Sequence, residues 1–149
     1  MKTSSATVIV GAGLLNCCAA LAALGGDVAS IEADRAHMKA QRRIFSIQKF
    51  SVQEIRTSYG TTVREYVSPT GKVFAVVWEG AHMPDLQQLF GDYFAAYQDA
   101  AKASRKGRGP LSIEQSDLVV YSGGRMRGFA GRAYVPQLVP LDVSLDEIK

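Results

Sequence analysis

Five carboxylates lie on or beside the segments of this sequence that look most like strands and a helix: Glu54, Glu65, Glu79, Asp85 and Asp92. Two carboxylates can hydrolyse a glycosidic bond when they lie about 5 to 10 Å apart in one cleft. Arg64 and Glu65 are neighbours in an alternating segment, so their side chains point to opposite faces, and one of them shares a face with the flanking valines. Cross-strand ion pairs are therefore the simpler expectation for these acids.

Histidine is scarce, with His37 in a polar segment and His82 three residues before Asp85. A serine or cysteine nucleophile needs a base within hydrogen-bond reach, and neither histidine lies in a recognisable catalytic motif. His82 and Asp85 could form a local pair of the kind that is common on surfaces. Zinc needs three or four clustered His or Cys ligands, so the sequence predicts no metal site. No other motif indicates a catalytic residue or a cofactor.

Arginines and aromatic residues gather near the C-terminal end, in a segment that we expect to form a hairpin. By strand alternation, Arg125, Arg127 and Phe129 fall in one set, and Met126, Arg132 and Tyr134 fall in the other. Arginine beside aromatic residues is enriched at binding hot spots, although charge also keeps an exposed edge hairpin soluble. The candidate binding residues are Arg125, Arg127, Phe129, Arg132 and Tyr134.

Glycines near the N-terminus allow a nucleotide-binding interpretation. A strand-like run leads into Gly11 and Gly13 as in a dinucleotide-binding turn, and Glu32 stands where a ribose-binding acid would. The glycines would let the backbone approach a pyrophosphate at a helix N-terminus. Two features oppose this interpretation: Asn16 occupies the place of the third glycine, and the later segments resemble hairpin strands rather than crossover helices.

The same N-terminal segment has the order of a bacterial signal peptide. Lys2 gives a short cationic head, an uncharged run follows up to Ala22, and small residues precede the expected cut. We expect cleavage after Ala22, which leaves a single domain of residues 23–149 in the periplasm or outside the cell. The run is too interrupted to span a membrane, which takes about 20 consecutive apolar residues. Once it is cleaved, we expect no membrane span.

Cysteine and charge restrict the environment and the partners. Cys17 and Cys18 both lie in the predicted signal peptide, so the mature domain would contain no cysteine, as suits an oxidising compartment. A lipoprotein signal would place a small residue before its cysteine, whereas Asn16 precedes Cys17. The net charge is only +3, and basic and acidic residues alternate, so we expect no nucleic-acid partner. An unknown protein or envelope component is the expected partner.

The remaining pattern predicts an α+β fold. A polar N-terminal helix is expected over residues 30–42, with Ile31 and Met38 as its anchors. Period-2 segments then predict an antiparallel meander, with turns at Gly60 and at Ser68–Gly71. Its strands are expected at residues 44–50, 52–59, 61–67 and 72–78. The last strand is apolar in both alternating sets, which places it in the middle of the sheet with both faces covered.

One long amphipathic helix over residues 85–101 should pack against the meander. Gly91 within it indicates a close approach of helix and sheet. A basic stretch over residues 102–116 is expected to be a solvated loop. A second hairpin is expected over residues 117–121 and 126–135 around Gly123–Gly124. Ser144–Glu147 has the capping pattern of a short C-terminal helix.

Several distinctive stretches together resemble a bacterial family, domain-of-unknown-function family 2844. They are Gly60–Val67, Gly71–Trp78, Met83–Leu86 with Gly91–Phe94, and Gly131–Pro136. Ala23–Gly26 is similar to the start of the family's mature chain, which supports cleavage after Ala22. The resemblance covers nearly all of residues 23–149. It implies export and a shared fold, and it supplies no activity, cofactor or catalytic residue.

Three functions follow as expectations. The first is a non-catalytic exported module that binds a protein or envelope component through the candidate binding residues and the groove beside the long helix. The second is a carboxylate-dependent hydrolase of an envelope polymer. The third is a dinucleotide-binding protein that uses Gly11 and Gly13.

Overall fold

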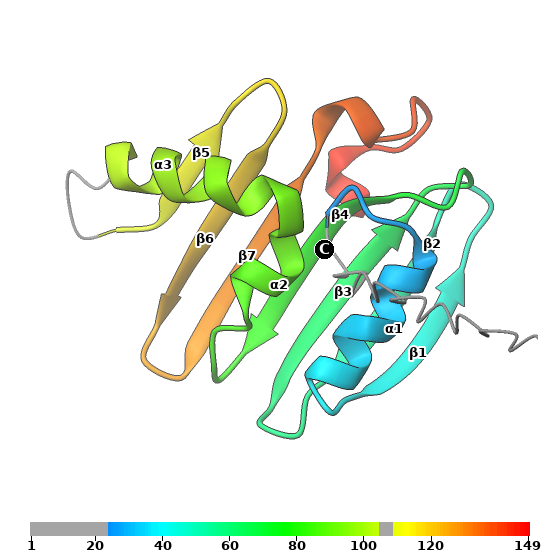
Figure 1. The fold of residues 1–149 in the computed structure, drawn as a ribbon, viewed down its shortest axis with the longest axis horizontal. Coiled ribbons are helices and arrows are strands. Elements are labelled where there is room, and N and C mark those ends of the chain that lie inside the picture. The colour runs from blue at the N-terminus through cyan, green and yellow to red at the C-terminus, as the bar shows by residue number, and fades with distance from the viewer. Residues whose placement is uncertain (1–23, 105–108) are drawn as a thin grey trace, which may run out of the picture.

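The computed structural model describes residues 24–104 and 109–149. The predicted signal peptide, both cysteines and the glycines of the possible nucleotide turn lie outside the described residues, as does the middle of the basic stretch. Seven strands form one antiparallel sheet, with helices against one face, as Figure 1 shows. The fold is therefore α+β.

The sheet consists of two meanders joined side by side. The spatial order is β1-β2-β3-β4-β7-β6-β5, and every neighbouring pair is antiparallel. The bounds are β1 Gln41–Ser46, β2 Ser51–Arg56, β3 Thr61–Val67, β4 Val73–Gly80, β5 Leu111–Glu114, β6 Val119–Arg125 and β7 Gly128–Tyr134. The first meander is the predicted one, with one correction: the strand expected at residues 44–50 is wrong in its bounds, because the chain turns at residues 47–50, where the Ile47 N–H donates to the Phe50 carbonyl at 2.9 Å. The second meander consists of β5, β6 and β7, and it joins the first through the pairing of β7 with β4.

Strand β4 is central, as its apolar sequence predicts. Val76 and Trp78 point to the face that the helices cover, and Ala75 and Val77 point to the opposite face. The turn before it is also confirmed, since the Gly71 N–H donates to the Ser68 carbonyl at 2.9 Å. We call the two surfaces of the sheet the helix face and the open face.

The predicted N-terminal helix is present but shorter than expected. Helix α1 spans Val28–His37, and the Asp27 carboxylate accepts a hydrogen bond from the Ala29 N–H at 3.1 Å. Ile31 and Met38 are buried, as predicted for its anchors. The prediction of a helix up to residue 42 is wrong because Arg42 already belongs to β1, where its Nε donates to Gln53 of β2 at 2.9 Å.

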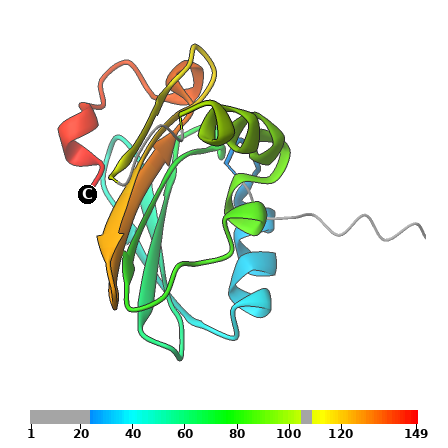
Figure 2. The same ribbon diagram turned by 90° about the vertical axis from the view of Figure 1, so that its left-hand side faces the viewer.

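The predicted long helix is divided in two. Helix α2 spans Leu86–Phe90, a 3₁₀ turn spans Gly91–Tyr93, and α3 spans Phe94–Ser104. Gly91 ends α2 with φ 49° and ψ −119°, a conformation that glycine adopts far more readily than other residues. The glycine therefore allows the break between α2 and the 3₁₀ turn. Figure 2 shows that α1, α2 and α3 all lie on one side of the sheet.

Two predictions after the helix are wrong. The basic stretch is not one loop, because α3 continues to Ser104 and Leu111–Glu114 forms the edge strand β5. The turn of the second hairpin is not at Gly123–Gly124, because both glycines lie within β6. The two-residue turn is Met126–Arg127, between the paired residues Arg125 and Gly128. Arg127 supplies the positive φ of 66°, so no glycine marked the turn.

The C-terminal segment crosses the open face and covers part of it. It contains two short 3₁₀ helices, Pro136–Leu138 and Leu145–Glu147. Ser144 caps the second one as predicted, since its Oγ accepts a hydrogen bond from the Asp146 N–H at 3.3 Å. Beneath the segment lie Phe50, Tyr66, Phe74 and Tyr134, which form a second apolar cluster with Ile148 of the segment itself. No helix among residues 24–104 and 109–149 is long and apolar enough to cross a membrane.

Candidate functional site

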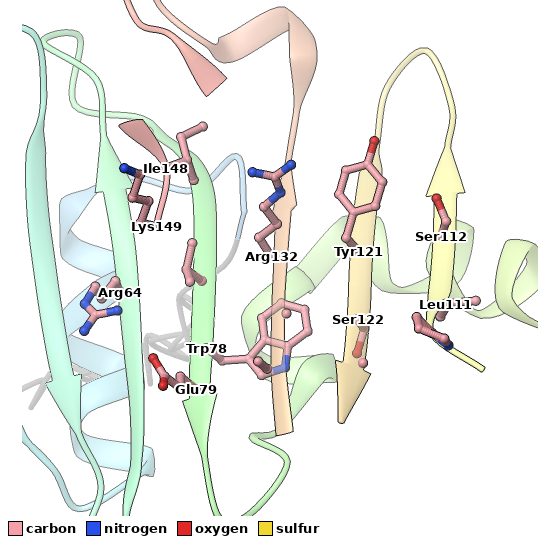
Figure 3. A pocket seen from close by; sticks show the side chains of 15 residues that line it. Arg64, Trp78, Glu79, Leu111, Ser112, Tyr121, Ser122, Arg132, Ile148 and Lys149 are labelled. Carbon is pink, nitrogen blue, oxygen red and sulfur yellow. The ribbon is translucent and has the colours of Figure 1, made fainter. Parts of the chain in front are cut away.

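A cavity of about 400 Å³ lies on the open face, beside the end of the C-terminal segment (Figure 3). Its floor consists of small or aliphatic residues of the central strands, Val77, Gly123 and Ala130. Charged and aromatic side chains surround the floor: Arg64, Glu79, Tyr121, Arg132 and Lys149. The cavity therefore combines an apolar base with a polar rim, the usual composition of a ligand site.

The hollow has a simple origin in the sequence. The C-terminal segment reaches Ile148, which is buried at one side of the cavity, and leaves the strands beyond it uncovered. On those strands, Gly123 and Ala130 are cross-strand partners with little or no side chain. The sheet surface is therefore low between the taller side chains of Tyr121 and Arg132 and those of Arg64 and Glu79.

Arg132 and Tyr121 form a fixed pair on neighbouring strands. The register of β6 and β7 places them opposite each other, and the guanidinium carbon lies 5.0 Å from the centre of the tyrosine ring. The Tyr121 hydroxyl donates a hydrogen bond to the Glu114 carboxylate at 2.9 Å, which raises the pKa of Tyr121 above its ordinary value. Among the described residues, no ion pair involves Arg132, so its charge is available to a ligand.

Arg64, by contrast, is already neutralised. Its Nε lies 3.1 Å from the Glu54 carboxylate, and Arg56 approaches the same carboxylate at 3.7 Å. This is the expected cross-strand ion pair, since Glu54 and Arg64 are register partners. Glu65 lies on the helix face and is 1% exposed, so the prediction that Arg64 and Glu65 point to opposite faces is confirmed.

The five candidate acids do not meet in one cleft. Glu79 lines the cavity, whereas Glu54 is held in its ion pair and Glu65 lies on the other face of the sheet. Asp85 caps α2 by accepting a hydrogen bond from the Gln88 N–H at 3.1 Å, and Asp92 lies in the 3₁₀ turn. The carboxylate mechanism would need a second acid beside Glu79.

His82 is attached to the turn between β2 and β3. Its Nδ1 lies 3.0 Å from the Tyr59 carbonyl oxygen, its ring packs edge to face with the Tyr59 ring, and its carbonyl accepts a hydrogen bond from Thr61. The side chain of His37 lies outside the described residues. No group of three or more His, Cys, Asp or Glu residues in the described ranges could hold a metal ion.

The structure separates the five predicted binding residues. Arg125 and Arg132 lie on the open face, on the two sides of the Gly123 and Ala130 floor. Tyr134 is on the same face but buried beneath the C-terminal segment, at 8% exposed. Phe129 points to the helix face, and Arg127 lies in the turn. Tyr121 was not predicted from the sequence, because its position opposite Arg132 depends on where the hairpin turns.

Tyr66 fixes the C-terminal segment at the rim of the cavity. Its hydroxyl donates to the Lys149 carbonyl and accepts a hydrogen bond from the Lys149 N–H at 2.9 Å. Burial raises the pKa of Tyr66 above its ordinary value, and the hydrogen bond to Lys149 opposes that shift. The native state therefore keeps the hydroxyl protonated at pH values where the unfolded chain has begun to lose the proton.

Replacing Tyr66 by phenylalanine should cost about 1–2 kcal/mol near pH 8, because two hydrogen bonds are lost. A tyrosine whose pKa is raised by folding stabilises the protein fully at pH values below its pKa in the unfolded chain, about 10. That stabilisation is lost as the pH rises through its pKa in the folded protein. The stability difference between wild type and Tyr66→Phe should therefore shrink above pH 10, as measured by urea unfolding. Tyr59→Phe, at an exposed tyrosine, is the control. A difference that stays constant up to pH 11 would contradict this account.

A family model described as "Protein of unknown function (DUF2844)" matches residues 20–148. No curated protein and no solved structure matches the chain. The match covers nearly the whole of the described fold, including both meanders and the cavity.

Proposed function

Because the chain belongs to the DUF2844 family, whose description assigns no activity, we propose a function from the open-face cavity: a non-catalytic, exported module that binds a protein or envelope component. The partner would present an anionic group to Arg132 and an aliphatic group to the floor of the cavity. Export rests on the order of charge, apolar run and small residues before Ala23.

The orientation of Arg132 carries this proposal. An arginine side chain loses considerable freedom when it binds a ligand, and a side chain that is already held loses less. Tyr121 holds the Arg132 guanidinium from one side, and Glu114 holds Tyr121 through its hydroxyl. The Arg132 guanidinium has no acidic partner in the described ranges, and it can bind a carboxylate with two parallel hydrogen bonds.

The apolar floor adds the second half of the recognition. Val77 is half-buried and Ala130 is exposed, so a ligand that covers them removes apolar surface from water. Hot spots typically combine such a desolvated centre with an arginine or aromatic anchor. A peptide or envelope component with an aliphatic group next to a carboxylate matches both features.

Replacing Arg132 by alanine should reduce partner recovery at least tenfold, the loss expected when an arginine hot spot is truncated. The assay is co-purification from envelope extracts, with recovery quantified by mass spectrometry. Arg125→Ala should cause a smaller loss, since Arg125 lies on the same face at the end of its strand. Arg127→Ala is the matched control because this arginine lies in the turn.

Equal recovery by wild type and Arg132→Ala would reject the cavity as the binding site. A loss with Arg127→Ala but not with Arg132→Ala would move the site to the tip of the hairpin. Export is tested separately, by the intact mass of the protein recovered from the periplasm. A first residue of Ala23 would support export, and a retained N-terminus would contradict the cleavage and favour the nucleotide-binding alternative.

A further inference from the structure

The two edges of the sheet differ in how they are protected. Exposed edge strands can pair with other chains, and proteins usually blunt them by short length, proline, charge or a covering element. Strand β5 has four residues, follows Pro110 and contacts α3. Strand β1 has six residues, contains no proline or acid, and pairs with β2 in unbroken register. Within residues 24–104 and 109–149, the β1 edge therefore has its two arginines but no proline and no further strand to protect it.

Strand β1 also exposes large apolar side chains on both faces of the sheet. Ile44 is 57% exposed and Phe45 is 52% exposed, and Ile47 just beyond the strand is 54% exposed. The charge of Arg42 is offset, since its guanidinium donates to Glu32 at 3.1 Å. Arg43 is the one remaining charge on the strand, and no ion pair in the described part of the chain includes it.

The outward backbone groups of β1 can be identified from one hydrogen bond. The Ile47 N–H donates to the Phe50 carbonyl at 2.9 Å, so the backbone of Ile47 is directed toward β2. Hydrogen-bonded and non-hydrogen-bonded pairs alternate along antiparallel strands. The backbone N–H and C=O groups of Arg42, Ile44 and Ser46 therefore point away from β2. On that side, the described part of the chain places no strand.

We propose that β1 pairs with β1 of a second copy of this chain, antiparallel and with Ile44 on the two-fold axis. Ile44 then lies opposite the partner's Ile44, and Arg42 lies opposite the partner's Ser46. All three outward-pointing residues take part, which gives about six backbone hydrogen bonds. The two sheets become one continuous sheet.

Charge and register favour a second copy in this arrangement. A two-fold pair must place residues of the same face opposite each other, which allows only registers centred on a residue. Centring on Arg43 would oppose two arginines, and centring on Phe45 would leave the outward groups of Arg42 beyond the paired strand. Centring on Ile44 uses every outward group and places Arg43 beside the partner's Phe45, an aromatic ring that can accept a cation.

The test is the mass of the purified protein by sedimentation velocity over a range of concentrations. Wild type should have twice the monomer mass. Ile44→Lys should raise the dissociation constant at least tenfold, because two lysines would oppose each other on the axis. Ile44→Pro should do the same, because proline removes an outward N–H and leaves the bonds to β2 intact. Leu141→Lys changes a fully exposed leucine elsewhere and should remain dimeric, as should Arg132→Ala.

A wild-type protein that stays monomeric up to about 1 mM overturns the proposal. A dimer that survives Ile44→Pro or Ile44→Lys, with the circular dichroism spectrum unchanged, also overturns it. Should the proline variant fail to fold, the lysine variant decides the matter, since the exposed Ile44 side chain can be replaced without disturbing the core. An extended segment of another protein that binds this edge while the chain itself stays monomeric would likewise overturn it.

Discussion

Gly131→Ala should destabilise the domain by about 3 kcal/mol or more, as measured by urea unfolding. A Cβ atom at this position would lie 2.2 Å from Cζ2 of the Trp78 ring and 2.8 Å from the Tyr121 carbonyl oxygen. Neither neighbour can yield, since Trp78 is fully buried against Phe90 and the carbonyl belongs to the β6 backbone. The indole ring occupies the place that a side chain on β7 would otherwise take.

Gly128→Ala is the matched control, because this glycine lies on the same strand and a Cβ there would meet nothing within 4 Å. It should change stability by less than about 0.5 kcal/mol. In a Trp78→Phe background, the smaller ring should make Gly131→Ala less costly, so the two substitutions should be non-additive. A Gly131→Ala variant as stable as Gly128→Ala would contradict the prediction, because the Trp78 ring and β7 would then move apart without loss of folding free energy.

Phe74→Ala should cost about 3–5 kcal/mol, the loss typical of a deleted core phenylalanine. The Phe74 ring is fully buried and packs edge to face against Phe50 and Tyr66 at centroid distances of 6.0 and 6.1 Å. These rings support the C-terminal segment, so the substitution should also weaken the wall of the cavity. Since domains are stable by only about 5–15 kcal/mol, the loss is a large fraction of the total.

Leu141→Ala, at a residue with a fully exposed side chain, is the control and should leave the unfolding midpoint unchanged. Limited proteolysis separates the two effects of Phe74→Ala. Protease cleavage within residues 136–149 should become faster in the Phe74→Ala variant, under conditions in which the sheet is still folded. A variant that loses stability without any change in the cleavage of residues 136–149 would contradict the proposed role of the cluster.

The sequence predicted most of the first meander, because its strands alternate regularly and the turns at Gly60 and Ser68–Gly71 carry strong local signals. The turn at residues 47–50 was predicted as strand because it contains neither glycine nor proline. Val73–Trp78 is apolar in both sets, and Ser68–Gly71 has the residues of a tight turn. The helix over residues 85–101 was identified by its apolar stripe, but the break at Gly91 was not. A stripe reports which side chains are buried, and it does not distinguish a continuous helix from two helices with a 3₁₀ turn between them.

The candidate site was predicted only in part, and the reason is register. Arg132 was identified from composition, whereas Tyr121 was not, because placing the turn at Gly123–Gly124 pairs the wrong residues across the hairpin. A slip in register changes which side chains are opposite each other and moves them between faces. The floor of the cavity could not be predicted either, since it depends on where the C-terminal segment stops covering the sheet.

The pairing of β4 with β7 has a kinetic consequence. Each meander joins strands that are neighbours in the sequence, whereas this seam joins strands separated by both helices and two further strands. Contacts between distant parts of a chain are slower to form than local ones. The two meanders should therefore assemble first, and their docking, with the indole of Trp78 settling over Gly131, should limit the rate at which the chain reaches its native state.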